Sequence, residues 1–409
     1  MTDGWVLRRW GDIATIEYGK SLRDYGDRVD GYRVYGTNGP IGWHDAPLYA
    51  HPSVIIGRKG AYRGIHYSPE PFFVIDTAFF LKPTQPMDMR WAYYELLTHD
   101  INSMDSGSAI PSTSREDFYA LPVLVPPLEE QRAIASVLGA LDDKIDLNRR
   151  MNETLEAIAR AIFKSWFVDF DPVRAKAGGE QPWGMDAATA ALFPDAFEDS
   201  ELGEIPQGWT VMNVPEAFEV NPQRRLAAGA VAPYLPMSAM PTDSARPHEW
   251  ELRDAGSGAR FVNGDVLVAR ITPCLENGKT AFVDFLDEGQ VGWGSTEYIV
   301  LRSKPPLPLH FAYLFARTAD FRMFAIGNMT GTSGRQRVPV DCLNNFKLAV
   351  PDEQVARAFE RMVEPTFASM RQRDEESTTL AELRDTLLPK LLSGEVRVGA
   401  AEQMVEAVS

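Results

Sequence analysis

The segment most like a catalytic motif is Pro273–Thr280, PCLENGKT, which ends in the manner of a phosphate-binding loop. Such a loop follows GxxxxGK[ST], and its first glycine permits the tight turn that directs backbone N–H groups at phosphate. Proline stands at that first position. The segment is therefore not expected to bind a nucleotide.

The chain also lacks the residue patterns typical of metal sites and of amino-methyltransferases. The six histidines include no HxxxH or HExxH pair, and the two cysteines, Cys274 and Cys342, have no CxxC spacing. Both cysteines are expected to be reduced and structural. Asn221-Pro222 continues into Gln223 rather than into the Pro-aromatic pair of an amino-methyltransferase motif. No catalytic or metal-binding residue is predicted.

Adjacent carboxylates occur at Asp142-Asp143 and Glu375-Glu376. Both pairs fall in helical patterns, where a solvated face is the usual reason for neighbouring acids. They are interpreted as surface residues of helices and not as an acid–base pair.

Side chains suited to a polyanion gather near predicted turns. Arginine and lysine pair with guanine edges or phosphates, asparagine pairs with adenine, and glycine lets the backbone approach a nucleic-acid strand. Ordinary solvated loops are the alternative for any one cluster, and clusters at equivalent positions of a repeat favour binding. The candidate DNA-binding residues are Lys20, Ser21, Arg23, Arg58, Lys59, Tyr62, Arg63, Ser108, Arg115, Arg224, Arg225, Arg270, Asn277, Lys279, Thr332, Ser333, Arg335 and Arg337.

Two apolar runs, Ser53–Gly57 and Asp265–Ala269, are predicted to be core strands that place Arg58 and Arg270 at their ends. Residues 1–127 and 209–351, which contain these runs, mix strand-like segments with Gly, Pro and Asn turns, and the first has a predicted helix at Met89–Leu97. We call these segments module 1 and module 2. The predicted fold class is α+β.

A long helix is predicted from Leu128 to Phe167, because these residues contain no proline and apolar residues recur at intervals of four and three. Asparagine occupies two seam positions, which weakens packing but favours a single register. The helical region is assigned to residues 128–172. Its predicted seam is Ile134, Leu138, Leu141, Ile145, Asn148, Asn152, Leu155, Ala159, Ile162 and Trp166.

A faint internal repeat relates the two halves of the chain. Trp209 corresponds to Trp5, and Asp265–Arg270 corresponds to Ser53–Arg58. A Val-Pro/Glu/Gln junction precedes the helical pattern in each half. Two such helices in one chain are expected to pair antiparallel, about a pseudo-two-fold axis, with the modules at opposite ends. The second helical region is assigned to residues 352–394. Its predicted seam is Val355, Phe359, Met362, Leu380, Leu383, Leu387 and Leu391.

The remaining segments complete the predicted organisation. Pro365 predicts a kink or an unsatisfied carbonyl in the second helix, and Gly394 predicts its end. Residues 173–208 are expected to be a lightly packed acidic connector with a short helix near 186–192, and residues 395–409 a disordered tail.

Composition limits the class of protein. With 409 residues and 44% hydrophobic side chains, the chain can form more than one core. The formal charge of −16 disfavours a polyanion partner at first sight, but the excess acid falls mostly outside the two modules, which are near neutral. No run of eighteen apolar residues and no signal-peptide pattern occurs, so a soluble, cytoplasmic protein without membrane contact is expected.

Several motifs carry a resemblance to a known family. VPPLEEQRAI at 125–134, LDDKIDLN at 141–148 and KSWFVDFDP at 164–172 resemble the specificity subunit of Type I restriction–modification systems. RITPCLENGKT at 270–280 and LRDTLLPKLLSG at 383–394 look like the second half of the same family. The resemblance covers nearly the whole chain.

The resemblance implies a non-catalytic subunit in which modules 1 and 2 are target-recognition domains, each reading one half of a bipartite DNA sequence in the major groove. It implies that the helix pair sets the spacing and binds two copies of an adenine methyltransferase subunit, with ATP-driven restriction subunits joining them. S-adenosylmethionine, ATP and Mg would be bound by those partners and no cofactor by this chain. A protein-interaction scaffold that does not bind DNA is the alternative, and the target bases are not encoded in local patterns.

Overall fold

The computed structural model describes residues 4–26, 30–104, 111–332 and 334–407. The chain forms two compact units, of which unit 1 comprises residues 1–146 and 376–409 and unit 2 comprises residues 147–375. Each unit therefore contains one module and one half of each long helix. This division cuts across the predicted domain boundaries, because each module shares its hydrophobic core with helix residues.

Module 1 contains two main sheets, with strand orders β2-β8-β5-β6 and β4-β3-β7, and a two-stranded sheet β1-β9. The predicted strand β5 is central and wholly buried, and the predicted helix α2 packs against β5 and β6. The Asp88 side chain starts α2 by accepting the N–H groups of Arg90 and Trp91. The elements are β1 (Val6–Arg9), α1 (Trp10–Ile13), β2 (Ala14–Tyr18), β3 (Tyr32–Gly36), β4 (Gly39–His44), β5 (Ser53–Gly57), β6 (Ile65–Ser68), β7 (Phe72–Val74), β8 (Ala78–Pro83), α2 (Met89–Leu97), η1 (Ile101–Ser103), α3 (Arg115–Ala120) and β9 (Pro122–Val125).

Module 2 repeats this plan. Its sheets have the orders β13-β20-β17-β18 and β15-β14-β19-β16, with a two-stranded sheet β12-β21. The faint sequence repeat is thus a topological repeat, in which β17 takes the place of β5. The elements are β12 (Thr210–Asn213), α7 (Val214–Ala217), β13 (Phe218–Val220), β14 (Val231–Leu235), η2 (Met237–Ala239), β15 (Glu251–Asp254), β16 (Arg260–Phe261), β17 (Val266–Ala269), β18 (Thr280–Phe282), β19 (Gly292–Gly294), β20 (Tyr298–Ser303), α8 (Leu309–Ala316), α9 (Ala319–Gly327), η3 (Val340–Asn345) and β21 (Lys347–Val350).

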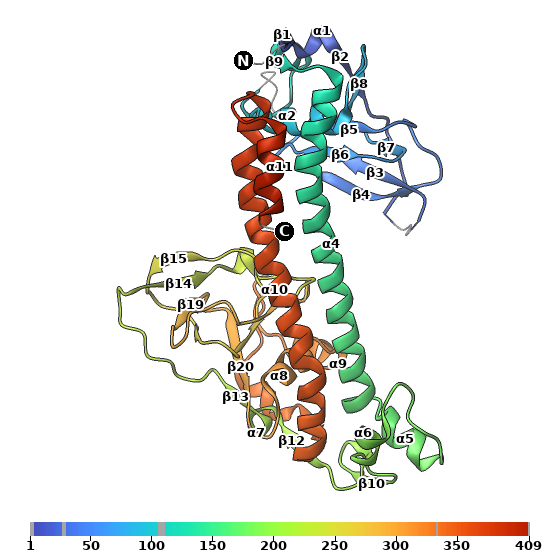
Figure 1. Ribbon diagram of the computed structural model, residues 1–409. Coiled ribbons are helices and arrows are strands. Elements are labelled where there is room, and N and C mark those ends of the chain that lie inside the picture. The colour runs from blue at the N-terminus through green and yellow to red at the C-terminus, as the bar shows by residue number, and fades with distance from the viewer. Residues whose placement is uncertain (1–3, 27–29, 105–110, 333, 408–409) are drawn as a thin grey trace. The chain divides into compact units, whose positions relative to one another are not determined.

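The two long helices are α4 (Leu128–Phe167) and α10 (Glu353–Leu392), and in each unit half of α4 lies beside half of α10 (Figure 1). In unit 1, Lys144 pairs with Glu376 at 3.3 Å and Asp142 with Arg384 at 2.7 Å, so partner numbers rise on α10 as they fall on α4. The predicted antiparallel pairing is confirmed.

The apolar side of α10 differs from the prediction at one position. Met362 is 41% exposed, whereas Val363 is 1% exposed and packs in the core of unit 2. The cause is a helical spacing of four from Phe359 to Val363 and again to Phe367, which moves Met362 to the outer face. The helix continues through Pro365, where the Thr366 hydroxyl donates to the Met362 carbonyl at 3.1 Å, and ends before Gly394 at φ +73°.

Both segments expected to be loosely packed are more ordered than predicted. The connector forms α5 (Asp171–Ala177), the predicted short helix α6 (Ala187–Ala191), and a hairpin of β10 (Phe197–Ser200) and β11 (Gly203–Pro206). Val173 and Phe193 of this segment are buried in the core of unit 2. The tail forms α11 (Val398–Glu406), because Val398, Ala401 and Val405 make an apolar helical face that packs in unit 1.

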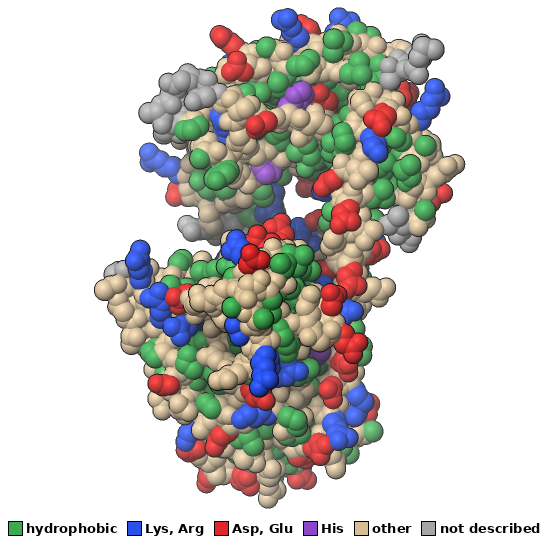
Figure 2. Space-filling view, turned by 90° about the vertical axis from the view of Figure 1, so that its left-hand side faces the viewer, with side chains coloured by type: hydrophobic (Ala, Val, Ile, Leu, Met, Phe, Trp, Pro, Cys, Tyr) green, Lys and Arg blue, Asp and Glu red, His purple; other side chains and the backbone are tan. Residues whose placement is uncertain are grey.

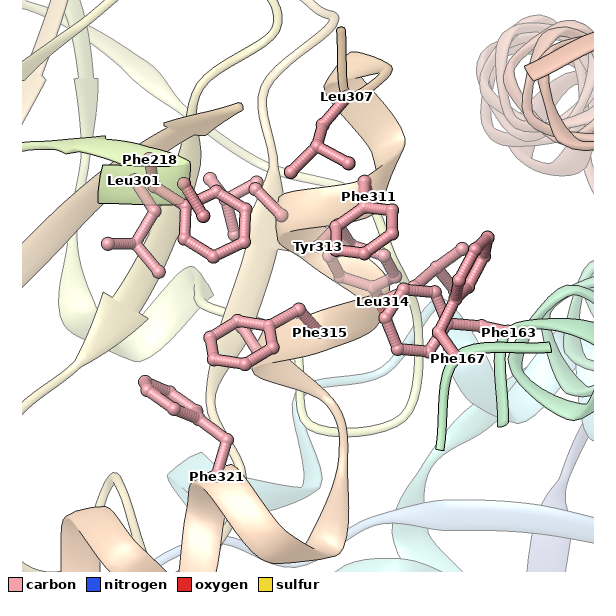
Figure 3. Packing of buried hydrophobic residues seen from close by; sticks show 14 of the residues in the cluster. Phe163, Phe167, Phe218, Leu301, Leu307, Phe311, Tyr313, Leu314, Phe315 and Phe321 are labelled. Atoms are coloured by element: carbon pink, nitrogen blue, oxygen red, sulfur yellow. The ribbon is translucent and has the colours of Figure 1, made fainter. Parts of the chain in front are cut away.

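The core of unit 2 joins α4 to module 2 through aromatic residues. The rings of Phe163 and Phe167 lie 4.8 and 5.0 Å from that of Phe311 on α8 (Figure 3). Burying a phenylalanine side chain stabilises a fold by about 1.5–3 kcal/mol. This packing fixes module 2 on the end of α4.

No helix within the described ranges is long and apolar enough to cross a membrane.

Candidate nucleic-acid interface

In module 1 the predicted residues Arg58 and Arg115 meet at one aromatic ring. Their guanidinium carbons lie 4.8 and 5.1 Å from the ring centroid of Tyr18, which is 46% exposed. Arg58 also donates to the Asp76 carbonyl at 2.9 Å, and Arg115 to the Ile16 carbonyl at 2.7 Å. The ring and the two carbonyls hold two cations side by side at the surface, where a phosphate or a base edge can approach them.

Other module 1 candidates are exposed, with one exception. Arg63 is 3% exposed and donates to the carbonyls of Asn102 and Met104, so it stabilises the loop and does not present its charge to a ligand. Ser108 lies outside the described residues. The exposed candidates are Lys20, Ser21, Arg23, Lys59 and Tyr62.

In module 2 the predicted residues Arg270 and Arg337 meet at a carboxylate. Nε of Arg337 donates to Oε1 of Glu297 at 2.8 Å, and Nε of Arg270 donates to Oε2 at 3.3 Å. The Arg337 side chain keeps 43% of its surface exposed. The Glu297 carboxylate therefore holds the side chains of Arg270 and Arg337 side by side.

Two further module 2 candidates serve the fold. Arg224 donates to Asp265, whose side chain is fully buried, at 3.1 Å. Lys279 donates to the Met237 carbonyl at 2.6 Å and to that of Ser238 at 3.4 Å, so the GKT-like segment uses its amine to fasten a turn. Ser333 is outside the described residues. The exposed candidates are Arg225, Asn277, Thr332 and Arg335.

Arg58 and Arg270 occupy the same backbone position in the repeat. The Arg58 N–H donates to the Thr77 carbonyl at 2.9 Å, and the Arg270 N–H donates to the Glu297 carbonyl at 3.0 Å. Each arginine follows the central strand and pairs with the residue that precedes the neighbouring strand. Tyr18 and Glu297, which organise the arginines, are not among the predicted residues. Aligning the two copies of the repeat around Thr77 would have drawn attention to Glu297.

Of the carboxylates interpreted as surface acids, Asp143 and Glu375 are exposed as predicted, whereas Asp142 is partly buried and joins elements of unit 1. In unit 1, Asp142 accepts from the Tyr94 hydroxyl at 2.6 Å and from Arg384 at 2.7 Å, while Asp143 pairs with Arg90. The reason is that α2 and α10 pack beside this turn of α4 and supply donors that the helical pattern does not reveal.

In unit 2 the corresponding acid is Glu156. It accepts from the Tyr313 hydroxyl at 2.7 Å and lies 3.5 Å from Arg317. Burial raises the pKa of the Glu156 carboxyl, and the bond from Tyr313 and the charge of Arg317 act in the opposite direction. A carboxylate of α4 is therefore part of the contact with its module in each unit.

The predicted seam residues are mostly buried where the helix halves pair. Asn152 is 7% exposed, and its amide donates to Asp374 at 2.8 Å and to the Met370 carbonyl at 3.1 Å, both on α10. Asn148 donates to the Arg373 carbonyl at 3.5 Å. The described seam residues with less than 2% exposure are Ile134, Leu138, Leu141, Ala159, Val355, Phe359, Leu380, Leu387 and Leu391.

The described surface mixes basic and acidic side chains. Lysine and arginine appear in small groups interspersed with carboxylates, without one continuous basic face on the side drawn in Figure 2. Cys274 and Cys342 are free thiols, as predicted. Among the residues described, no three His, Cys, Asp or Glu side chains are grouped so as to hold a metal ion.

Comparison with known proteins identifies similar sequences. A family model described as the Type I restriction modification DNA specificity domain matches residues 2–157. The Type I restriction enzyme HindI specificity subunit of Haemophilus influenzae is 26% identical over 337 residues, which cover 70% of this chain and 71% of the relative. The MjaIX specificity subunit of Methanocaldococcus jannaschii is 23% identical over 77% of this chain and 71% of the relative.

A solved structure has the same fold. The S subunit of a Type I restriction–modification system from M. genitalium matches with a TM-score of 0.59 and 16% identity, over 95% of this chain and 96% of that one. The family model, the relatives in two organisms and the repeated module-and-helix fold agree. The chain is thus similar in sequence to specificity subunits of Type I restriction–modification systems and shares the fold of one solved S subunit.

Proposed function

We propose that this chain is the DNA-specificity subunit of a Type I restriction–modification complex and that each module reads one half of a bipartite target. The observation that carries this proposal is the pair Arg58 and Arg270, which occupy one backbone position in the matching sheets β2-β8-β5-β6 and β13-β20-β17-β18. Their surroundings differ, with Tyr18 beside one and Glu297 beside the other. Two modules with the same backbone arrangement but different side chains at the contact are suited to two half-sites of different sequence.

The same proposal assigns catalysis to partners. This chain would contribute recognition and assembly, and an adenine methyltransferase and a restriction subunit would bind S-adenosylmethionine, ATP and Mg. Such a complex acts on cytoplasmic DNA. On the face drawn in Figure 2, basic groups are interspersed with acids, which supports the proposal that the modules supply specific contacts and partner surfaces much of the phosphate binding.

An apolar stripe on α4 supports methyltransferase binding to unit 2. Leu147, Met151 and Ile158 lie on one helical face and are 51%, 37% and 49% exposed. Close to Ile158, a groove of ≈ 380 Å³ includes Ala157 and Ala161 of the same helix in its lining. Exposed apolar surface on a helix indicates a protein partner, and in the proposed complex that partner is a methyltransferase subunit.

Competition binding tests the function. The chain assembled with its methyltransferase is mixed with a labelled duplex that carries the host's methylated motif, and unlabelled random duplexes compete. Specific recognition predicts that the motif competes about a thousandfold or more better than random sequence. Equal competition by all duplexes would exclude a specificity role and would favour the protein-interaction alternative.

A further inference from the structure

The Arg270–Glu297–Arg337 cluster of module 2 has an unusual division of its hydrogen bonds. Oε1 of Glu297 accepts from Arg337 and Oε2 accepts from Arg270, so that the two carboxylate oxygens serve different arginines. The side chains of Arg270, Glu297 and Arg337 are 29%, 19% and 43% exposed, respectively. Nε and Nη2 of Arg337 both lie 2.8 Å from Oε1 of Glu297, which leaves Nη1 and the outer N–H of Nη2 facing away from the carboxylate.

The backbone of each member is also fixed. The Arg270 N–H donates to the Glu297 carbonyl, and Arg337 exchanges two backbone hydrogen bonds with Thr330, of 2.8 and 2.9 Å. Within the described part of the chain, Nη1 and Nη2 of Arg270 donate no hydrogen bond, and its Nε donates to Glu297. The cluster therefore combines immobilised guanidinium groups with N–H donors still available to a ligand, which lowers the entropy lost on binding.

A second carboxylate in module 2 shows what a purely structural arrangement looks like. Asp265 also accepts from two arginines, Arg224 and Arg302, at 3.1 and 2.8 Å. Its side chain has no exposed surface. Glu297 makes the same type of double pairing with 19% of its side chain exposed, so this pairing lies where a ligand can reach it.

Module 1 lacks this carboxylate at the corresponding place. Thr77 stands where module 2 has Glu297, and Ser112 stands where it has Arg337, by the matching bridges from Lys59 to Ser112 and from Ile271 to Arg337. The carboxylate-supported pair of arginines is thus a feature of one module. Side chains that differ at equivalent positions of the two modules are suited to recognising half-sites of different sequence.

We infer that Arg337 reads a guanine of the module 2 half-site through O6 and N7, and that Glu297 positions Arg337 and Arg270 for this contact. The inference rests on the proposed function and adds the base and the residue that make the contact. Paired N–H donors of arginine match the two acceptors of guanine in the major groove. Both Glu297 oxygens already accept from arginine, so the carboxylate supports the arginines rather than binding a cytosine amino group.

Replacing single guanine atoms tests the contact. The chain assembled with its methyltransferase is titrated with duplexes in which each guanine of the target is changed in turn to 7-deazaguanine, which lacks the N7 acceptor. Wild-type complex should lose about fivefold or more in affinity at one guanine. Arg337→Ala should bind the natural target more weakly by at least that factor and become indifferent to 7-deazaguanine at that position alone.

Glu297→Gln tests positioning. It should keep the salt dependence of binding but reduce discrimination between guanine and 7-deazaguanine at the same position, which a loss of folding would not do selectively. Arg253→Ala, an exposed change on strand β15 of the same module, is the control and should leave discrimination intact. Thermal unfolding of each variant identifies any that fail to fold.

Failure of the inference and failure of the proposed function give different results. A wild-type complex that prefers its motif over random DNA but ignores 7-deazaguanine everywhere would overturn the inference alone. Retained 7-deazaguanine sensitivity in Arg337→Ala would do the same, as would a Glu297→Gln complex that weakens equally on unrelated DNA. Absence of any preference in the wild type would overturn the proposed function itself.

Discussion

The hydroxyl of Tyr94 on α2 donates a 2.6 Å hydrogen bond to Oδ2 of Asp142 on α4. Burial and the adjacent Asp142 raise the pKa of Tyr94, so the phenol remains a donor. The other oxygen of Asp142 accepts from Arg384 on α10. One carboxylate thus joins module 1 to both helix halves of unit 1.

Removing this donor should loosen unit 1. Tyr94→Phe keeps the ring but leaves one oxygen of Asp142 without its partner, and it should lower the free energy of unfolding by about 1.5–3 kcal/mol. Urea titration followed by tryptophan fluorescence measures the change. Tyr93→Phe on the same helix is the control, and a loss as large as that of Tyr94→Phe would contradict the assignment.

Glu156 should make unit 2 sensitive to pH. Its folded-state pKa is raised by burial, so the folded state holds the proton more tightly than the unfolded state. The resulting stabilisation is complete below the unfolded pKa, near 4.5, and is lost as the pH rises through the folded pKa. Between pH 4 and pH 7, the wild type should therefore lose stability relative to Glu156→Gln.

Unfolding titrations of both proteins across that pH range measure this difference. The exposed residue Glu153 on the same helix provides the control, since Glu153→Gln should follow the wild-type pH dependence. A Glu156→Gln curve parallel to the wild-type curve would show that Glu156 does not titrate differently in the folded state.

Arg58 and Arg270 should each serve one half-site. Arg58→Ala should weaken recognition in one half of the target, and Arg270→Ala in the other, each by about 1–3 kcal/mol if the arginine contacts a base. Binding to duplexes altered in one half-site measures the loss. Arg253→Ala, on strand β15, is the control. Equal weakening on unrelated DNA would make the two arginines phosphate contacts.

Asn152 should restrict the register of the helix pair. Asn152→Leu removes its hydrogen bonds to Asp374 and Met370 and should permit a second register, visible as methylated sites with an additional spacing between half-sites. Mapping methylated adenines in cells that carry the variant measures the spacing. Glu153→Leu changes the neighbouring exposed position and should preserve a single spacing. An unchanged spacing with unchanged assembly in Asn152→Leu would count against the register role.

The apolar stripe on α4 should be needed for assembly. Ile158→Asp places a charge within the proposed methyltransferase contact and should weaken complex formation by about tenfold or more, since burying an isoleucine contributes about 1.5–3 kcal/mol. Analytical ultracentrifugation of the mixed subunits measures it. Leu252→Asp, at an exposed position of β15, is the control, and equal effects of the two changes would argue against a specific contact.

Local sequence determined the elements whose signals lie within a few residues of each other. The double proline before Leu128 and the unbroken apolar spacing to Phe167 define α4, and its bounds were predicted correctly. Helix α2 was also predicted correctly at Met89–Leu97, and in the structure the Asp88 side chain caps its N-terminus. The internal repeat and the family motifs predicted that the module and the long helix each occur twice in the chain.

Tertiary packing decided which chemically similar residues face a ligand and which face the core. Arg63 and Arg58 are both arginines in one basic cluster, yet the first is buried against backbone carbonyls and the second is stacked at the surface. Glu297 became significant only because two strand ends bring it to Arg270 and Arg337. Sequence patterns encode the period of a helix or strand, whereas the partners of a polar side chain depend on segments far away in the chain.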